Sequence, residues 1–106
     1  MKINRKMKSG YSTEIAKQYV TEGKPIYFVS SFEEIQHKYV DGERTNEIAA
    51  YKYYFVQEGL NPFAIKFENE IIDMPSFLSK VSVIDLEAVE VRSNVYFKAK
   101  SIEVIK

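Results

Sequence analysis

Tyrosines stand beside basic residues at three places in this chain, and this pairing is its most chemically suggestive pattern. The places are Tyr51-Lys52-Tyr53-Tyr54, Tyr96-Phe97-Lys98 and His37-Lys38-Tyr39. Aromatic rings stack on nucleobases while lysines contact phosphates, which is the common chemistry of single-strand nucleic-acid binding. Tyrosine and phenylalanine are also favoured in β-strands and in small cores. The pattern therefore predicts either a surface that binds single strands or the packing of a small β-rich core.

The chain offers little for catalysis or for metal binding. His37 is its one histidine and cysteine is absent, which excludes a cysteine–histidine nucleophile and a histidine-rich metal cluster. Glu68, Glu70 and Asp73 could hold a hard cation through oxygen atoms, but their spacing does not fit an EF-hand loop and equally suits a solvated loop. No glycine-rich phosphate loop or hydrolase motif is present. We therefore expect a protein that is not an enzyme and that holds no cofactor or metal.

Length and composition predict one folded domain. A chain of 106 residues with 45% apolar and 28% charged residues suits a single hydrophobic core. The absence of cysteine favours a reducing compartment. No stretch approaches the roughly 18 apolar residues of a membrane span. We expect a cytoplasmic protein that has no membrane segment.

The net charge of zero conceals basic ends and an acidic middle. Residues 1–13 carry four basic residues and no acidic residue, a charge of +4. Residues 14–91 carry 7 basic and 14 acidic residues, a charge of −7, and residues 92–106 have a charge of +3. This polarity is compatible with phosphate contacts and with a protein interface, and it favours neither.

The chain divides into an N-terminal arm and one domain. Residues 1–12 are expected to form a flexible basic arm, because they are polar and show no hydrophobic period. Residues 13–106 are expected to form a single β-rich domain. It begins with a helix over residues 13–22, for which Ser12 and the residues after it offer a cap.

Two interpretations fit the segment after this helix. Residues 26–29 are apolar and β-branched or aromatic, which predicts a short buried strand. In residues 30–40, Ser31 and Glu34 have the spacing of a helix capping box, yet the segment also fits an irregular strand. We favour the strand, because the hairpin that follows needs a partner.

Asp41-Gly42 is a strong hairpin signal, since both central residues of a type I′ turn need a positive φ. The segment that follows, residues 47–57, is the clearest strand in the sequence. Alternation places three aromatic residues on the face expected to meet the core, namely Tyr51, Tyr53 and Phe55. That assignment leaves Lys52 and Tyr54 on the exposed face.

The rest of the chain predicts further strands. We expect a turn, an alternating strand, a short helix, a long strand bent by bulges and two final strands, at residues 59–62, 63–68, 74–79, 81–92, 95–99 and 102–105. In the alternating strand, Phe63, Ile65 and Phe67 are expected to face inward. This order matches a mainly β fold, a small five-stranded OB-like barrel with one or two short helices. An α+β roll is the alternative.

Two segments resemble a known family. Asp41-Gly42, Thr45, Glu47-Ile48 and the tyrosine at Tyr51 or Tyr53 resemble the middle of the YdcP-like, or helicase-processivity-factor-like, small proteins of Gram-positive integrative and conjugative elements. The closing run of residues 96–102 resembles that family's terminal strand. The resemblance covers residues 41–106. It implies an OB-like protein that assists replication of a mobile element by binding single-stranded DNA and a host helicase. It carries over Thr45, Glu47, Tyr51 and Lys98, chiefly as structural positions.

The sequence therefore favours a non-catalytic single-stranded DNA-binding accessory protein of a plasmid, conjugative element or phage, active in replication or transfer. The expected partners are single-stranded DNA and a host helicase or other replication protein, with a homodimer left open. A protein–protein adaptor or regulator that acts on a host protein is the alternative, and a small carboxylate hydrolase or isomerase is a third. The expected DNA contacts are Lys52, Tyr54, Lys66, Arg92, Tyr96, Lys98, Lys100, Arg5, Lys6 and Lys8.

Overall fold

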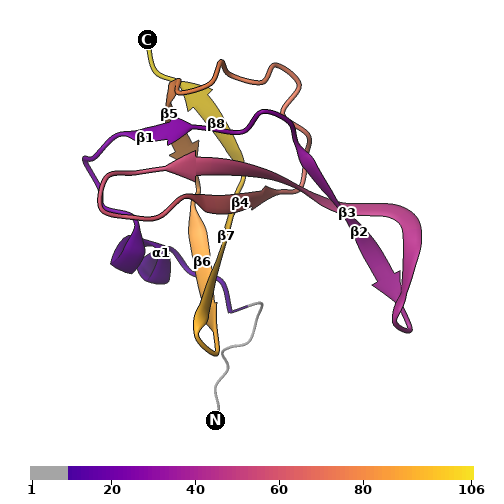
Figure 1. The fold of residues 1–106 in the computed structure, drawn as a ribbon. Coiled ribbons are helices and arrows are strands. Elements are labelled where there is room, and N and C mark those ends of the chain that lie inside the picture. Colours follow the sequence, from indigo (N-terminus) through magenta and orange to yellow (C-terminus); the bar gives the residue numbers. More distant parts are fainter. Residues whose placement is uncertain (1–9) are drawn as a thin grey trace.

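The structure is a computed structural model and describes residues 10–106. These residues form one helix and eight strands (Figure 1), with the bounds α1 (Thr13–Tyr19), β1 (Ile26–Phe28), β2 (Glu34–Val40), β3 (Glu43–Val56), β4 (Phe63–Phe67), β5 (Lys80–Ile84), β6 (Glu87–Val91), β7 (Asn94–Ala99) and β8 (Ser101–Val104). The Ser12 side chain caps α1 by accepting a hydrogen bond from the Ile15 N–H at 3.1 Å. Helix formation at this place, predicted over residues 13–22, is confirmed for the first seven of them.

The strands form one open, mixed sheet in the order β6-β7-β4-β3-β1-β5-β8, with β2 attached to β3 outside this path. β4 and β7 are parallel, whereas the other described pairs are antiparallel. β3 is 14 residues long, and its two halves have different surroundings. Figure 1 shows β2 and the first half of β3 leaving the rest of the molecule as a projecting hairpin.

One face of the sheet carries an aromatic core. Its most buried large side chains come from three neighbouring strands and are Phe28, Tyr53, Phe55, Ile65 and Phe67. Rings from different strands meet edge to face, with 5.5 Å between the centroids of Phe28 and Phe55 and 5.7 Å between those of Tyr53 and Phe67. Such geometry places the positive edge of one ring against the negative face of another. The predicted inward face of β3 and β4 is confirmed.

The hairpin turn is also confirmed. Asp41 and Gly42 both have positive φ values, 53° and 81°, as a two-residue type I′ turn requires. Residues 34–40 are a strand rather than a capped helix, which agrees with the favoured interpretation of that segment.

The prediction of a small, mainly β domain is confirmed, but the five-stranded OB-like barrel is wrong. The sheet is open and has eight strands within residues 10–106. The long, bent strand predicted over residues 81–92 is present as two consecutive segments, β5 and β6, which pair with β8 and β7 in one continuous antiparallel register from Val81↔Val104 to Val91↔Asn94. β5 pairs with β1 and β8, whereas β6 pairs with β7. The chain bends between them at Asp85, whose φ is 57°, and the Lys100 N–H donates to the Ile84 carbonyl at 2.9 Å beside this bend (Figure 1).

The short helix predicted over residues 74–79 is also wrong. This segment is a turn without helical hydrogen bonds, and Leu78 has a φ of 71°. Its backbone forms hydrogen bonds with β1 instead. The Leu78 N–H donates to the Phe28 carbonyl at 2.6 Å, and the Phe28 N–H donates to the Ser79 carbonyl at 2.9 Å. Pairing with a buried strand has outweighed the helix-start signal of the proline.

Candidate nucleic-acid interface

Three lysines form a row across the middle of the sheet. Lys52 of β3 is opposite Lys66 of β4, and Lys66 is opposite Lys98 of β7. The neighbours Tyr53 and Ile65 point into the core, so alternation places the lysines on the outer face. We call Lys52, Lys66 and Lys98 the lysine row. Adjacent strands are about 4.8 Å apart, so the row concentrates three positive charges over about 10 Å.

Aromatic rings accompany the row. Tyr54 and Tyr96 each lie two residues from a row lysine on the same strand, and therefore on the same face. Tyr96 is 49% exposed and Tyr54 is half-buried. The ring of Tyr11 lies under two of the lysines, with Lys98 Nζ 4.6 Å and Lys66 Nζ 5.3 Å from its centroid. These distances suit cation–π contacts.

A hollow of about 490 Å³ opens beside the row. Its lining includes Tyr11, Lys66, Lys98 and Lys100, together with the small residue Ala50. This volume lies within the range of small-ligand sites, about 300–1,000 Å³. The hollow therefore provides a concave surface at which two row lysines and one aromatic ring converge.

Carboxylates border the row at both ends. Glu87 is opposite Lys98 across β6 and β7, with 3.7 Å between its Oε1 and Lys98 Nζ. Glu34 is opposite Lys52 across β2 and β3. Glu68 and Asp85 also line the hollow. The row is therefore a short positive segment within a face of mixed charge, and Lys66 is its central member.

Glu34 also influences a neighbouring tyrosine. The Tyr54 hydroxyl donates a hydrogen bond to Glu34 Oε1 at 3.4 Å. Partial burial raises the pKa of Tyr54, and the negative charge of Glu34 raises it further. Tyr54 is therefore neutral at physiological pH, as a stacking ring should be.

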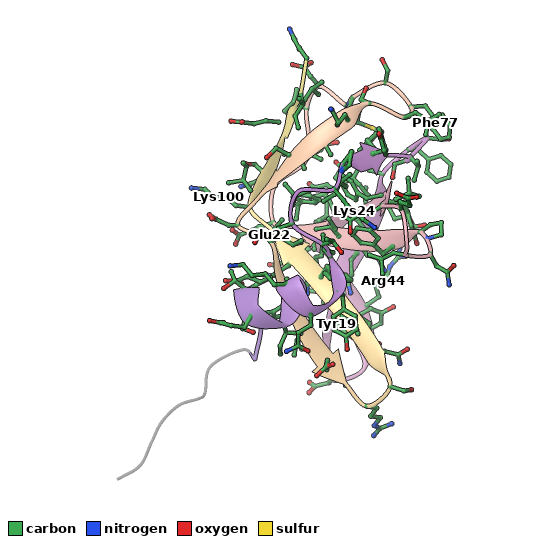
Figure 2. All side chains as sticks on the ribbon, turned by 90° about the vertical axis from the view of Figure 1, so that its left-hand side faces the viewer. Tyr19, Glu22, Lys24, Arg44, Phe77 and Lys100 are labelled. Carbon is green, nitrogen blue, oxygen red and sulfur yellow. The ribbon has the colours of Figure 1, made fainter. Side chains whose placement is uncertain are left out.

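The structure brings six of the predicted DNA contacts together and separates one. The six on or beside the outer face are Lys52, Tyr54, Lys66, Tyr96, Lys98 and Lys100. Figure 2 shows Lys100 at the outer margin of the molecule. Arg92 lies in the turn between β6 and β7, at the end of that hairpin remote from Lys98. Arg5, Lys6 and Lys8 lie outside the described residues.

The sequence prediction missed Tyr11. It fell within the residues 1–12 assigned to the N-terminal arm, yet Tyr11 covers two row lysines and the Ser12 N–H donates to the Ala88 carbonyl at 2.9 Å. The available signal was an aromatic residue placed directly before the helix cap. Without the sheet order, that signal could not be connected to Lys66 or Lys98.

The residues considered for catalysis or metal binding have other positions. Tyr53, from the core, donates its hydroxyl to Glu33 Oε1 at 2.8 Å and accepts the Ile71 N–H at 2.9 Å. Glu70 lies beside Glu33, and a hydrogen bond between the two carboxyl groups raises the pKa of Glu70. His37 lies in β2, with a buried Nδ1 that has no hydrogen-bond partner. Within residues 10–106, no group of three or more histidine or carboxylate side chains is arranged to hold a metal ion.

Comparison of this chain with protein-family models, with curated proteins and with solved structures finds no match. The resemblance to small proteins of conjugative elements therefore stays a prediction that rests on the residues quoted above. Among the described residues, no helix has the length and apolar character needed to cross a membrane.

Proposed function

We propose that this protein binds single-stranded DNA on the outer face of β3, β4 and β7, as a non-catalytic cytoplasmic accessory protein of a mobile element. The observation that supports the proposal is the lysine row, in which three strands present one lysine each at the same level. Tyr54 and Tyr96 share this face and supply rings for stacking. The role in a mobile element rests on the family resemblance.

The geometry suggests how a strand would bind. Phosphates would contact the lysine row, and two bases would stack on Tyr54 and Tyr96, which are separated by the intervening strand β4, or about 10 Å. Lys66 and Lys98 would exchange their contact with the Tyr11 ring for phosphate oxygens, or would make both contacts at once. Rings and lysines do not read base edges, so this mode predicts little sequence preference.

The salt dependence of binding tests the number of phosphate contacts. Three phosphate contacts to a single strand predict that the logarithm of affinity falls with the logarithm of salt with a slope of about −2. Fluorescence anisotropy with labelled single- and double-stranded oligonucleotides measures both the preference and the slope. We expect tighter binding of the single strand.

Matched lysine variants distinguish DNA binding by the lysine row from a non-specific effect of positive charge. Lys66→Ala should weaken binding and reduce the slope by about 0.7, because one contact is lost. Lys80→Ala removes an exposed lysine on β5, outside the row, and should leave the slope unchanged. Tyr54→Ala should weaken binding with little change in the thermal midpoint. If wild type binds no oligonucleotide, or both lysine variants behave alike, the proposed interface is wrong.

The N-terminal arm requires a separate test. If Lys2, Arg5, Lys6 and Lys8 also contact phosphates, they steepen the slope by up to about 3 beyond the value of about −2 due to the row, and their removal should return it to about −2. An unchanged slope would remove the arm from the interface and leave the lysine row as the binding surface.

A protein adaptor is the second candidate, favoured by the loop between β4 and β5. Ile72, Phe77 and Leu78 in this loop are 81%, 62% and 56% exposed. Figure 2 shows Phe77 and Lys100 at opposite margins of the molecule, so a protein partner at this loop would lie away from Lys100. Binding of a purified host replicative helicase to wild type and to Phe77→Ser tests this candidate, since only a loop contact makes the two differ.

A further inference from the structure

The hairpin arm is the least supported part of the sheet. We define it as β2, the turn at Asp41-Gly42 and residues 43–49 of β3. Figure 1 shows it projecting from the rest of the molecule. Within the described residues, β2 pairs with β3 and with no other strand, so its second edge has open backbone hydrogen-bonding groups. A two-stranded hairpin is marginally stable by itself, and an open edge is a template for another strand.

The face that forms the core continues along this arm without a cover. Ile35 is opposite Tyr51, and His37 is opposite Ile48, so these residues share the face that carries Tyr53 in the core. The register shift between Gln36 and His37 keeps Ile48 on that face, although it is three residues from Tyr51. The large apolar side chains that this arrangement leaves exposed are Ile35, Tyr39 and Ile48, at 46%, 66% and 42%.

The charge of the arm disfavours DNA as the molecule that covers this face. Residues 34–49 contain four acidic and two basic residues, a net charge of −2. Phosphates would be repelled, unlike at the lysine row. Exposed apolar side chains beside an open strand edge are typical of a protein interface.

We propose that β2 pairs antiparallel with β2 of a second copy of this chain, centred on His37. In that register, Ile35 faces the partner's Tyr39, and Tyr39 faces the partner's Ile35. Glu34 lies diagonally across from the partner's Lys38, so both ends of the pair join opposite charges. The arrangement is isologous and closes as a dimer with twofold symmetry.

The sequence of β2 favours this register over its neighbours. Centring on His37 pairs all seven residues of β2. Centring on Ile35 or on Tyr39 pairs only three residues of the strand and leaves the other of these two apolar residues without a facing partner. Centring on Gln36 or on Lys38 pairs five residues of the strand and places His37, instead of an apolar residue, opposite Ile35 or Tyr39. Because β2 is self-complementary in this register, a second copy of the chain is the partner that suits its open edge.

Oligomeric state provides the first test. Light scattering after size-exclusion chromatography of the full chain should give a dimer whose fraction rises with concentration. Ile35→Lys and Tyr39→Lys each place a charge in the pair and should shift the dissociation constant at least tenfold toward monomer. Ile72→Lys, a matched change at an exposed apolar residue outside the arm, should stay dimeric. A wild type that is monomeric throughout, or a dimer that resists both arm substitutions, would overturn the proposal.

Engineered cysteines test the register, because the natural chain has none. His37→Cys places two thiols opposite each other at a Cα separation of about 5 Å, which suits a disulfide. Tyr39→Cys places its two thiols about 13 Å apart along the strands. With diamide as the oxidant of the two thiols, His37→Cys should form a covalent dimer at least tenfold faster than Tyr39→Cys. Equal rates would contradict pairing centred on His37, while DNA binding by the lysine row would be unaffected.

Discussion

The two halves of β3 show how strongly its neighbours determine the role of one continuous strand. In residues 50–56, β3 has β4 on one side and β2 and β1 on the other, and Tyr53 and Phe55 are completely buried. In residues 43–49, its described partner is β2 alone, and six of the seven residues are exposed. Strand formation depends on the turn and the backbone pairing, whereas stability depends on lateral partners and core contacts. Changes in the two halves should therefore have very different consequences.

Tyr53→Ala is the largest expected change. It removes a buried ring that contacts Phe28 and Phe67, together with hydrogen bonds to Glu33 and Ile71. We expect the free energy of unfolding to fall by about 3–5 kcal/mol. Urea unfolding measures this loss. The matched change in the arm, Ile48→Ala, should cost less than about 1 kcal/mol because its side chain is already exposed, and similar losses would contradict the division of β3.

The hydroxyl of Tyr53 predicts a loss of stability in alkali. The pKa of Tyr53 is raised from 10.0 to about 12, chiefly by burial and also by the hydrogen bond to Glu33, while the hydrogen bond from the Ile71 N–H acts in the opposite direction. The folded state therefore holds this proton more tightly than the unfolded state does. Its contribution is complete below about pH 10 and is lost as the pH rises through about 12, a loss of about 2–3 kcal/mol.

Tyr53→Phe is the control for this pH dependence. It keeps the ring and removes the titrating group, so the difference in unfolding free energy between wild type and variant should shrink between pH 10 and 12. Urea unfolding at a series of pH values measures that difference. A constant difference would show that the hydroxyl titrates alike in the folded and unfolded states.

Local signals in the sequence were sufficient for the elements and faces of the central strands. Asp41-Gly42 predicted the hairpin because only a few residues tolerate two successive positive φ values, and alternation assigned Tyr53 to the core and Lys52 to the outer face. These features depend on residues adjacent in the chain. The predicted hairpin and strand faces are therefore confirmed, although the predicted closed barrel is wrong.

The sheet order could not be predicted, because it depends on contacts between distant segments. The phase slip near Asp85 indicated the bend between β5 and β6, but it could not show that β5 pairs with β1 on its other side. Parallel pairing of β4 with β7 puts Lys66 beside Lys98, and no local spacing in the sequence encodes that contact. The candidate site was therefore predicted as separate residues, and the fold assembled six of them on or beside one face.

Gly42→Ala tests the independence of the arm. Gly42 has a φ of 81°, and a Cβ there would meet no atom within 4 Å, so the cost is conformational. A left-handed alanine costs about 1–2 kcal/mol. Hydrogen exchange measured by mass spectrometry should become about 5–30-fold faster in residues 34–49, and should change little in residues 50–56. Equal acceleration in both halves would show that arm and core unfold together.

Glu87→Gln makes the smallest change and tests the charges around the lysine row. Its ion pair with Lys98 is partly exposed, and such pairs contribute about 0–1 kcal/mol, so folding should hardly change. A phosphate on the row would lie roughly 7 Å from this carboxylate, where two like charges in water repel by about 0.6 kcal/mol. Neutralising Glu87 should therefore tighten single-strand binding about threefold at low salt, with a smaller gain at high salt. Glu103→Gln, on β8 away from the row, should not alter binding. Because most substitutions in an interface weaken it, a gain confined to Glu87→Gln would identify the phosphate position more specifically than any loss, whereas equal affinity for both variants would place the phosphates elsewhere.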